Sequence, residues 1–539
     1  MSICNLCSTL PNKTINMKKI IFFSILFFNF CVTYAQPTVV WSKYFGGDQG
    51  EAKSIQQTAD GGYIVAGVAR NPHLEAVGYQ ASGDGFVVKV DAEFNLQWSK
   101  CYGSELTEYI NMIKPCSDGG YVFVGMAQKL GYSNWQPTSM AYNAWIVKID
   151  ATGAVQWEKK YGGSHDDEAR SVDFLPDGAL VVTGYSRSVA DDVIGNYGMA
   201  DYWIIKLDAS NGEILTNQNY GGEENDFGYS AVANSDGTTV AVGESFSESV
   251  DVTCRNPRLI CESDIWVIKT DGNGEIIWNR CFGSNAQGSN FFNTGHQIIH
   301  TIDGGYAIVG SGRNTHMGYT FGLNDLWIIK IDANGYSQWK NWYGGSYDDR
   351  GVSIKQTSDG GFIVAGDTYS DDDQVTVGHL GTDSKQNGWV IKVDATGQLE
   401  WQRAVGSSDW GFDYLSDIVA ISLNEYIAVG KAGKPNDDCS EMDGRGFWIT
   451  KLSYNELGLE NQAISSFQVS PNPVQNILNL TSVYPIHTAS VVDIAGRQVL
   501  IQSSDNITEI NLAFLSPGIY HLQATGANGI LGRKKIIKI

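Results

Sequence analysis

The stretch that decides the fold is Gln338-Trp-Lys-Asn-Trp-Tyr-Gly-Gly-Ser-Tyr-Asp-Asp349, followed by Ser353-Ile-Lys-Gln-Thr-Ser-Asp-Gly-Gly-Phe-Ile-Val-Ala-Gly366 and by Gly388-Trp-Val-Ile-Lys-Val-Asp-Ala-Thr-Gly397. It is the clearest copy of a unit that the chain repeats. The copies open at Trp41, Trp98, Trp157, Thr216, Trp278, Trp339 and Trp401, at successive distances of 57, 59, 59, 62, 61 and 62 residues. Such a steady period indicates a repeat architecture of seven units.

Two further markers recur in the units. One is an Asp-Gly pair between apolar runs, which predicts a hairpin with a type I′ turn, because glycine supplies the positive φ. These pairs begin at Asp60, Asp118, Asp177, Asp236, Asp303 and Asp359, and the seventh copy has Asn424-Glu425 instead. The other is an aromatic residue three positions before a lysine, as in Trp389 and Lys392. A feature of every repeat is more often architectural than functional, so we interpret each lysine as an ion pair or hydrogen bond between blades.

Each unit therefore has four β-strands, and the sequence predicts an all-β chain: a seven-bladed β-propeller over residues 36–456, then a small C-terminal β-sandwich. The ends of the array support a closed ring. The segment from Val40 to Phe45 is a lone fourth strand, and the last copy lacks a fourth strand after Leu452. The N-terminal strand can thus complete the C-terminal blade.

The N-terminus has the pattern of a secretory signal peptide over residues 1–35, with Met17 as the expected start. Lys18 and Lys19 precede an apolar run from Ile20 to Cys31, and small residues follow. The alternative is a membrane anchor, for which the run is short, so we expect no transmembrane span in the mature chain. The net charge of −22 argues against nucleic acid as a partner.

Cysteines outside this segment fit an exported protein. Cys254 and Cys261 lie in one loop, where an oxidising compartment allows a disulfide between them. The remaining thiols lie in different repeats and are expected to be buried and unpaired: Cys101, Cys116, Cys281 and Cys439. None has the spacing of a zinc site.

Residues 457–465 are polar and are predicted to be a linker, and a different domain follows over 466–539. Its short alternating strands and turns carry four ordered motifs, at Pro471-Asn472-Pro473, Asp493 to Gly496-Arg497, Gly518 to Tyr520, and Lys534-Lys535 to Lys538. In these motifs the domain resembles the type A C-terminal sorting domain of the Bacteroidetes type IX secretion system. The resemblance implies passage across the outer membrane, contact with that secretion machinery, and release or attachment at the cell surface. The repeats resemble bacterial SBBP-type β-propeller repeats, which implies a scaffold and no single activity.

Binding is expected on the face that carries the long connections between the second and third strands of each unit, because long loops on a rigid scaffold commonly bind ligands. The connections between units return to the same face. A glycan or a protein is the expected ligand, and packing among the loops is the alternative use of the same residues. The candidate ligand-binding residues in the loops are His73, Tyr132, Trp135, Tyr197, Arg255, Arg258, His316, Tyr319 and His379; Tyr79 has the same character.

The segments between units are acidic and lie on this face as well. Asp166, Asp167, Asp348 and Asp349 are the candidate metal ligands, because calcium takes several carboxylate oxygens. The alternatives are capping of the strand starts and pairing with the repeated lysines. No Asp-x-Asp-x-Asp-Gly loop is present, and no other cofactor is predicted.

No catalytic constellation stands out. His296 and His300 lie four residues apart, but the glutamate of a His-Glu-x-x-His motif is missing, so both are interpreted as ordinary strand histidines. The sequence therefore favours a secreted or cell-surface propeller with a non-catalytic binding role. An extracellular polysaccharide hydrolase or lyase is the first alternative, which a buried carboxylate pair of raised pKa in a cleft of the loop face would favour. A structural or adhesive surface protein is the second.

Overall fold

The computed structural model describes residues 36–48, 50–70, 76–80, 83–130, 140–254, 262–283, 292–313, 324–376, 386–406, 412–433, 446–454, 467–482, 485–493, 498–526 and 529–539. The predicted signal peptide with Met17 and the predicted linker lie outside the described residues. All the regular elements in the described ranges are β-strands. These ranges contain no helix that is long and apolar enough to cross a membrane.

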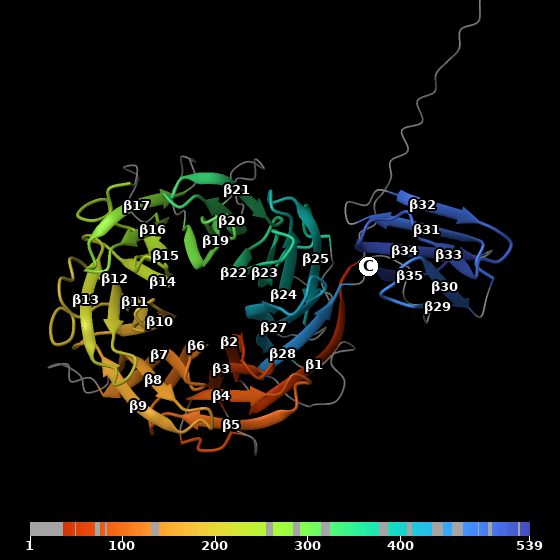
Figure 1. Ribbon diagram of the computed structural model, residues 1–539. Coiled ribbons are helices and arrows are strands. Elements are labelled where there is room, and N and C mark those ends of the chain that lie inside the picture. The colour runs from red at the N-terminus through yellow and green to blue at the C-terminus, as the bar shows by residue number, and fades with distance from the viewer. Residues whose placement is uncertain are drawn as a thin grey trace, which may run out of the picture.

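Within the described ranges, strands β1 to β28 form seven four-stranded antiparallel sheets around a central axis, which confirms the seven-bladed propeller (Figure 1). The innermost strands of blades 1 to 7 are β2 (Glu51–Gln57), β6 (Glu108–Pro115), β10 (Asp167–Phe174), β14 (Asp226–Ala233), β18 (Thr294–His300), β22 (Asp349–Gln356) and β26 (Tyr414–Ala420). The second strands are β3 (Tyr63–Ala69), β7 (Tyr121–Leu130), β11 (Leu180–Ser186), β15 (Thr239–Ser245), β19 (Tyr306–Arg313), β23 (Phe362–Thr368) and β27 (Glu425–Ala432).

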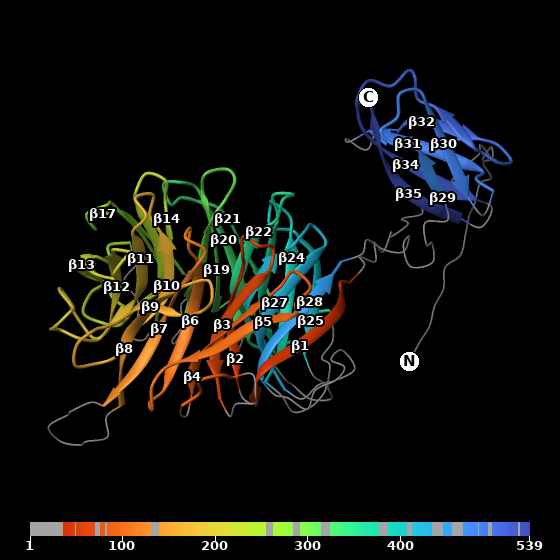
Figure 2. The same cartoon turned by 60° about the horizontal axis from the view of Figure 1, so that its bottom comes forward.

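The third strands are β4 (Asp84–Val90), β8 (Met140–Ile149), β12 (Asp201–Leu207), β16 (Asp264–Thr270), β20 (Asn324–Ile331), β24 (Asn387–Val393) and β28 (Gly446–Ser453). The outermost strands are β5 (Leu96–Tyr102), β9 (Val155–Tyr161), β13 (Ile214–Tyr220), β17 (Ile276–Phe282), β21 (Ser337–Tyr343), β25 (Leu399–Val405) and, in blade 7, β1 (Thr38–Asp48). The strands run between the two faces of the ring (Figure 2).

The predicted closure of the ring is confirmed. Strand β1 pairs antiparallel with β28, with Trp41 opposite Lys451 and Phe45 opposite Phe447. The first strand of the propeller thus lies beside the last one, and the seventh blade is complete. A closed ring leaves no blade with an unfilled fourth position.

The second and third strands form the apolar core of the blades. Every residue of β3 and β4 is buried, which explains why these runs are almost continuously apolar. The repeated aromatic residue of the third strand is fully buried in each blade, at Phe86, Trp145, Trp203, Trp266, Trp327, Trp389 and Trp448. The sequence repeat is therefore a repeat of core packing.

The repeated lysine contacts its own blade, so the prediction of a contact between blades is wrong. Lys89 Nζ lies 2.8 Å from Asp60 Oδ2, and Lys392 Nζ lies 3.0 Å from Asp359 Oδ2. These aspartates belong to the Asp-Gly hairpins between the first and second strands. In blade 7, where Asp-Gly is missing, Lys451 Nζ lies 2.8 Å from Glu425 Oε1. Two markers of the sequence repeat thus form one ion pair inside a blade.

The hairpins also differ from the predicted type I′ turn. Gly61 has a φ of 83°, whereas the φ of Asp60 is not positive. Gly61 N donates a hydrogen bond to Thr58 O at 2.9 Å. The loop is therefore a type I turn followed by a left-handed glycine, because one residue rather than two has positive φ.

The C-terminal residues form two sheets that share a core around Leu478, Val491, Ile510, Leu522 and Ile536. Strands β29 (Phe467–Ser470), β30 (Ile477–Ser482) and β33 (Glu509–Asn511) form one sheet. Strands β32 (Gln498–Ser503), β31 (Thr488–Asp493), β34 (Gly518–Gly526) and β35 (Gly529–Lys538) form the other.

Candidate ligand-binding channel

Each innermost strand contains a β-bulge, and the extra residue faces the axis of the ring. The register of β10 against β11 shifts between Ala169 and Ser171, so Arg170 is the extra residue. The same shift occurs at equivalent positions of the other six strands. Bulges commonly redirect a side chain and occur beside functional sites. The seven bulge residues are Lys53, Asn111, Arg170, Tyr229, His296, Val352 and Ser416.

A glycine in the second strand makes each bulge possible. A Cβ atom at Gly184 would overlap the carbonyl oxygen of Glu168, which precedes the bulge of β10. Gly184 also pairs with Trp203 on its other side. The same overlap with an innermost-strand carbonyl would occur at Gly67, Gly125, Gly243, Gly310, Gly366 and Gly430. The glycine that ends the apolar run of each repeat is therefore a sequence signal for the bulge.

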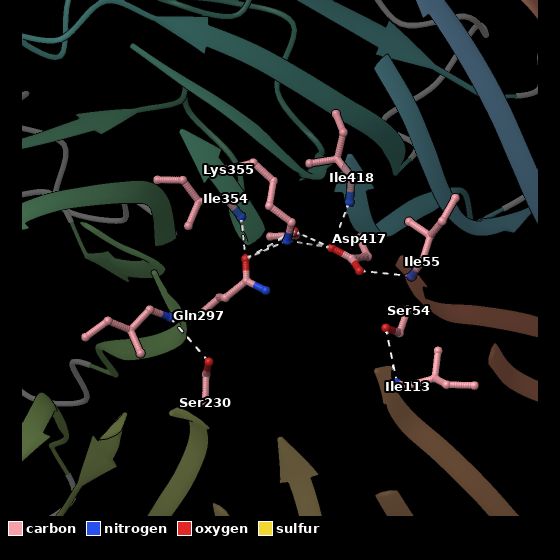
Figure 3. Close-up of polar contacts among 11 residues, drawn as sticks. Ser54, Ile55, Ile113, Ser230, Gln297, Ile354, Lys355, Asp417 and Ile418 are labelled. Atoms are coloured by element: carbon pink, nitrogen blue, oxygen red, sulfur yellow. Dashed lines mark hydrogen bonds and ion pairs between the residues drawn. The ribbon is translucent and has the colours of Figure 1, made fainter. Parts of the chain in front are cut away.

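The residue after each bulge residue links its blade to the next one. Ser171 Oγ accepts a hydrogen bond from Ala231 N at 3.2 Å, and Gln297 Oε1 accepts one from Ile354 N at 2.7 Å. Asp417 closes the ring, because its Oδ2 accepts a hydrogen bond from Ile55 N of blade 1 at 3.0 Å (Figure 3). The equivalent residues at the other junctions are Ser54, Met112, Ser230 and Ser353.

A cavity of about 280 Å³ lies at the axis, lined by residues of all seven innermost strands. This volume is slightly below the range of pockets that enclose a drug-sized molecule. The seven bulge residues all line it. The remaining lining residues are Ser54, Met112, Glu168, Ser171, Ser230, Gln297 and Asp417.

Arg170 is the most constrained charged group of the cavity. Its Nη2 donates a hydrogen bond to Glu168 Oε2 at 3.1 Å. Its guanidinium carbon lies 4.1 Å from the ring centre of Tyr229 and 4.9 Å from that of Tyr185. Such contacts with two rings hold a guanidinium in place. Its Nη1 is buried without a hydrogen-bond partner among the described residues.

His296 lines the cavity, whereas His300 does not. The ring of His296 packs edge-on against Tyr229, with centroids 5.5 Å apart, and its Nε2 lies 3.4 Å from Ser311 Oγ. Burial, with smaller effects of the Arg170 and Arg350 charges, lowers the pKa of His296 to about 4. The side chain is therefore uncharged at neutral pH, which is consistent with a buried histidine in the lining of the cavity.

Of the nine loop residues predicted to bind a ligand, the structure describes Tyr197, whose side chain is 52% exposed. The other eight lie outside the described residues: His73, Tyr132, Trp135, Arg255, Arg258, His316, Tyr319 and His379. Other exposed apolar side chains lie in the same connection between β11 and β12, at Val189, Ile194 and Met199, and in the equivalent connection of the next blade, at Val250.

The four predicted metal ligands make hydrogen bonds at the connections between blades. Asp167 Oδ2 accepts hydrogen bonds from Gly163 N and Ser188 Oγ, both at 2.8 Å. Asp349 Oδ2 makes the same contacts with Gly345 N and Ser370 Oγ, also at 2.8 Å. Asp166 and Asp348 each accept a bond from a backbone N–H of a third strand. No group of three or more His, Cys, Asp or Glu residues suited to a metal ion occurs in the described part of the chain, and calcium stays a prediction.

Carboxyl groups with a raised pKa lie at blade junctions rather than in the cavity. Burial raises the pKa of Asp201 to about 7 and that of Asp226 to about 6, and each residue is fully buried. Burial likewise raises the pKa of Asp349 to about 6. None of the three lines the cavity. Carboxyl groups of raised pKa, the feature that would favour a hydrolase, are therefore present in the fold but do not line this cavity.

The predicted disulfide between Cys254 and Cys261 is wrong. Cys254 is bonded to Cys281 of β17, with Cα atoms 5.4 Å apart. The sequence favoured Cys261 because it is close to Cys254 along the chain. In the fold, the chain at Cys254 packs against β17, the outermost strand of the same blade, which carries Cys281. Cys101 and Cys116 are free and half-buried, and burial raises the pKa of each thiol to about 12. Cys261 and Cys439 lie outside the described residues.

The motifs of the C-terminal domain meet across its sheets. Asn472 Oδ1 accepts a hydrogen bond from Ile537 N at 2.8 Å, and Tyr520 OH donates one to Ser516 O at 2.9 Å. Asp493 pairs with Tyr520 between β31 and β34, and Lys538 is only 7% exposed. Gly496 and Arg497 lie outside the described residues.

Comparisons with known proteins agree with this division. Residues 468–538 match the family described as the secretion system C-terminal sorting domain. Regulatory protein FlaEY of Caulobacter vibrioides is 24% identical over 435 residues, which cover 72% of this chain and 43% of that protein. The chain thus matches less than half of the length of this relative.

Two solved structures show a remote similarity of fold. Quinohemoprotein alcohol dehydrogenase from Comamonas testosteroni is 10% identical with a TM-score of 0.43, over 82% of this chain and 79% of that one. Sqt1 from Chaetomium thermophilum is 10% identical with a TM-score of 0.39, over 83% and 97%. The blade count rests on the strand pairing of this chain.

Proposed function

Because this β-propeller carries a C-terminal sorting domain of the type IX secretion system, we propose that it is a non-catalytic glycan-binding protein that acts outside the cell. In this proposal residues 1–35 direct export to the periplasm and are removed, and the sorting domain, of type A, then engages the secretion machinery. Release or attachment at the cell surface follows. The blades are proposed to be SBBP-type repeats that serve as a scaffold.

The observation that carries the proposal is the axial cavity, into which the seven bulges direct their side chains. Its lining combines hydroxyl, amide, imidazole and guanidinium groups with apolar surface, as sites for small polar ligands do. The loops of the second-to-third strand connections lie on the face where the innermost strands begin. A glycan could therefore contact the loops and place one end in the cavity. A cavity of about 280 Å³ has room for a single sugar unit rather than a chain.

The proposal is tested by thermal unfolding of the exported chain with a panel of oligosaccharides. A ligand that binds only the folded state raises its stability by about 2.7 kcal/mol at a hundredfold excess over Kd. We expect a rise with one class of glycan and no cleavage products by chromatography. Cleavage of the stabilising glycan would replace the binding role with the hydrolase or lyase alternative, and no shift with any glycan would contradict the proposal.

A protein ligand is the second candidate, and the exposed apolar group around Tyr197 favours it. Val189 and Ile194 are 70% and 64% exposed, and Met199 is 52% exposed. Clusters of exposed apolar side chains are commonly places of protein contact. A structural or adhesive role would use the same surface. An absence of glycan binding would move the assignment to this candidate.

A further inference from the structure

One blade lacks the tryptophan that opens every other repeat, and its neighbours show what that residue does. A Cβ atom at each of four turn glycines would meet an indole of the preceding blade: Gly153 meets Trp98, Gly212 meets Trp157, Gly335 meets Trp278, and Gly397 meets Trp339. At two more junctions Trp41 packs on Phe94 and Trp401 stacks on Tyr454. Thr216 of β13 stands at this position between blades 3 and 4. Six junctions are thus covered by an indole, and this one is not.

The junction of blades 3 and 4 is left open as a result. Gly274 is the equivalent turn glycine, and the three atoms nearest to a Cβ there belong to Gln218 and Tyr220, the third of them already 3.8 Å away. Gly274 is half-buried, whereas the four glycines under an indole are buried. Ile204 of the third strand is 8% exposed, whereas its equivalents Val87, Ile146, Val267, Ile328, Val390 and Ile449 are fully buried.

The open junction is a cleft with an apolar floor. Leu175, Val181 and Ile204 of blade 3 line it, together with Gly272 and Gly274 of blade 4. The enclosed part measures about 20 Å³, which is room for a single water molecule. The tryptophans over the four equivalent glycines are half-buried. A ring at this position therefore lies across the turn, with one side in solvent, and does not need an enclosed cavity.

The chemistry of the cleft suits a flat aromatic ring with a hydrogen-bond donor at its edge. Between blades 2 and 3, Trp157 Nε1 donates a hydrogen bond to Ala209 O at 3.1 Å. Gly272 is the equivalent of Ala209 in the turn of blade 4, and it lines the cleft. A turn with glycines at these positions lets a ring approach the backbone closely. Tryptophan and tyrosine are also enriched at protein interfaces, since they bury a large apolar area and still carry a donor.

We propose that the cleft beside Thr216 is a docking site for a tryptophan side chain of a partner protein. The partner's indole takes the place that the chain's own indole takes at the other junctions, and its Nε1 donates to Gly272 O. The turn at Gly274 and the hairpin at Gly237 lie at the strand ends opposite to the long loops. This site is therefore separate from the proposed glycan contact and does not depend on it.

The test uses N-acetyl-tryptophanamide as the probe, observed by saturation-transfer NMR with the exported chain. We expect the wild type to bind it, and to bind N-acetyl-leucinamide about tenfold more weakly, because that amide lacks both the flat ring and the donor. Thr216→Trp covers the cleft from within, so binding of the probe should be lost while the thermal midpoint stays at or above that of the wild type. Leu215→Trp is the matched control, since Leu215 of the same strand is 53% exposed and does not line the cleft. This variant should bind the probe as the wild type does.

Thr216→Phe places a smaller ring over the cleft and replaces Thr216→Trp in the test if that variant does not fold. Absence of binding to the wild type would overturn the proposal, and so would equal binding of the two amides. Binding that persists in a folded Thr216→Trp would place the probe elsewhere and would overturn it too. A wild-type dimer that Thr216→Trp dissociates, measured by light scattering, would assign the cleft to a second copy of this chain instead of a partner.

Discussion

Two fully buried carboxyl groups, those of Asp201 and Asp226, contribute to the response of this molecule to pH. They flank Gly221, where a Cβ atom would meet both carboxylates. Burial, and then the charges of Asp226 and Asp251, raise the pKa of Asp201 to about 7, although Tyr197 N donates a hydrogen bond to it. Ionising two carboxyl groups this close together is unfavourable, so one of them holds a proton near neutral pH.

The folded state therefore binds a proton at Asp201 more tightly than the unfolded chain, whose carboxyl group has the ordinary pKa of 3.8. The stability that this proton contributes is complete below pH 3.8 and is lost as the pH rises through about 7. We predict that the free energy of unfolding, measured with urea, falls between pH 5 and pH 8 by roughly 1–3 kcal/mol. An unfolding free energy that rises over this range would contradict the prediction.

Asp201→Asn isolates this residue. The amide is uncharged at every pH and its oxygen can still accept the hydrogen bond from Tyr197 N. The variant should show a smaller loss of stability between pH 5 and pH 8 than the wild type. Glu213→Gln, at an exposed position, serves as the control for replacing a carboxyl group with an amide.

At the scale of single elements, the innermost strand and its partner glycine act as one unit. Gly184 of β11 lies opposite the bulge of β10, and the carbonyl of Glu168 occupies the space that a side chain would need. A methyl group there must move backbone rather than a flexible side chain. The bulge is therefore fixed by the absence of a side chain on the neighbouring strand.

We predict that Gly184→Ala destabilises the protein by about 1–3 kcal/mol, the usual cost of overpacking, and abolishes glycan binding, because Arg170 sits on the displaced bulge. Urea denaturation and sugar titration measure the two effects. Gly272→Ala is the control, since its nearest non-neighbouring atom is Gly237 O at 3.9 Å. Wild-type affinity in Gly184→Ala would show that the bulge does not position the site.

The sequence predicted the elements better than it predicted the site. The period of the Trp residues and the unpaired strand at Val40 indicated the blades and their closure, because both features repeat or are missing at fixed places. The bulges were not predicted, because the short innermost strands mix polar and apolar residues, which hides the one-residue break that a bulge makes in the alternation of side chains. A signal was nevertheless present in Gly366 and its equivalents, which recur where a strand would favour a side chain.

Long-range contacts account for the wrong predictions. The sequence predicted the hairpin at Asp359 but not that Lys392 reaches it, because the direction of the lysine side chain depends on how the third strand packs beside that hairpin. Cys254 and Cys281 are 27 residues apart, and only the packing of the chain onto β17 makes them neighbours. The loop residues remain predictions, since eight of the nine lie outside the described residues.

At the scale of the whole molecule, the propeller ring and the sorting domain are two separate domains. Hydrogen bonds of the residues that follow the bulges join each described blade to the next, and Asp417 joins the seventh to the first. The blades therefore hold seven bulge residues at fixed positions around one axis. The C-terminal sheets have a hydrophobic core of their own, as expected of a separate domain.

The most direct test of a ligand in the axial cavity is to fill that cavity. Val352 lines it and is half-buried, and Val155 on β9 is 50% exposed on the outside of the ring. The glycan that gives the largest thermal shift is titrated calorimetrically into wild-type protein, Val352→Trp and Val155→Trp. We predict wild-type affinity for Val155→Trp and no measurable binding for Val352→Trp. Wild-type affinity in a correctly folded Val352→Trp would place the ligand elsewhere and contradict the assignment.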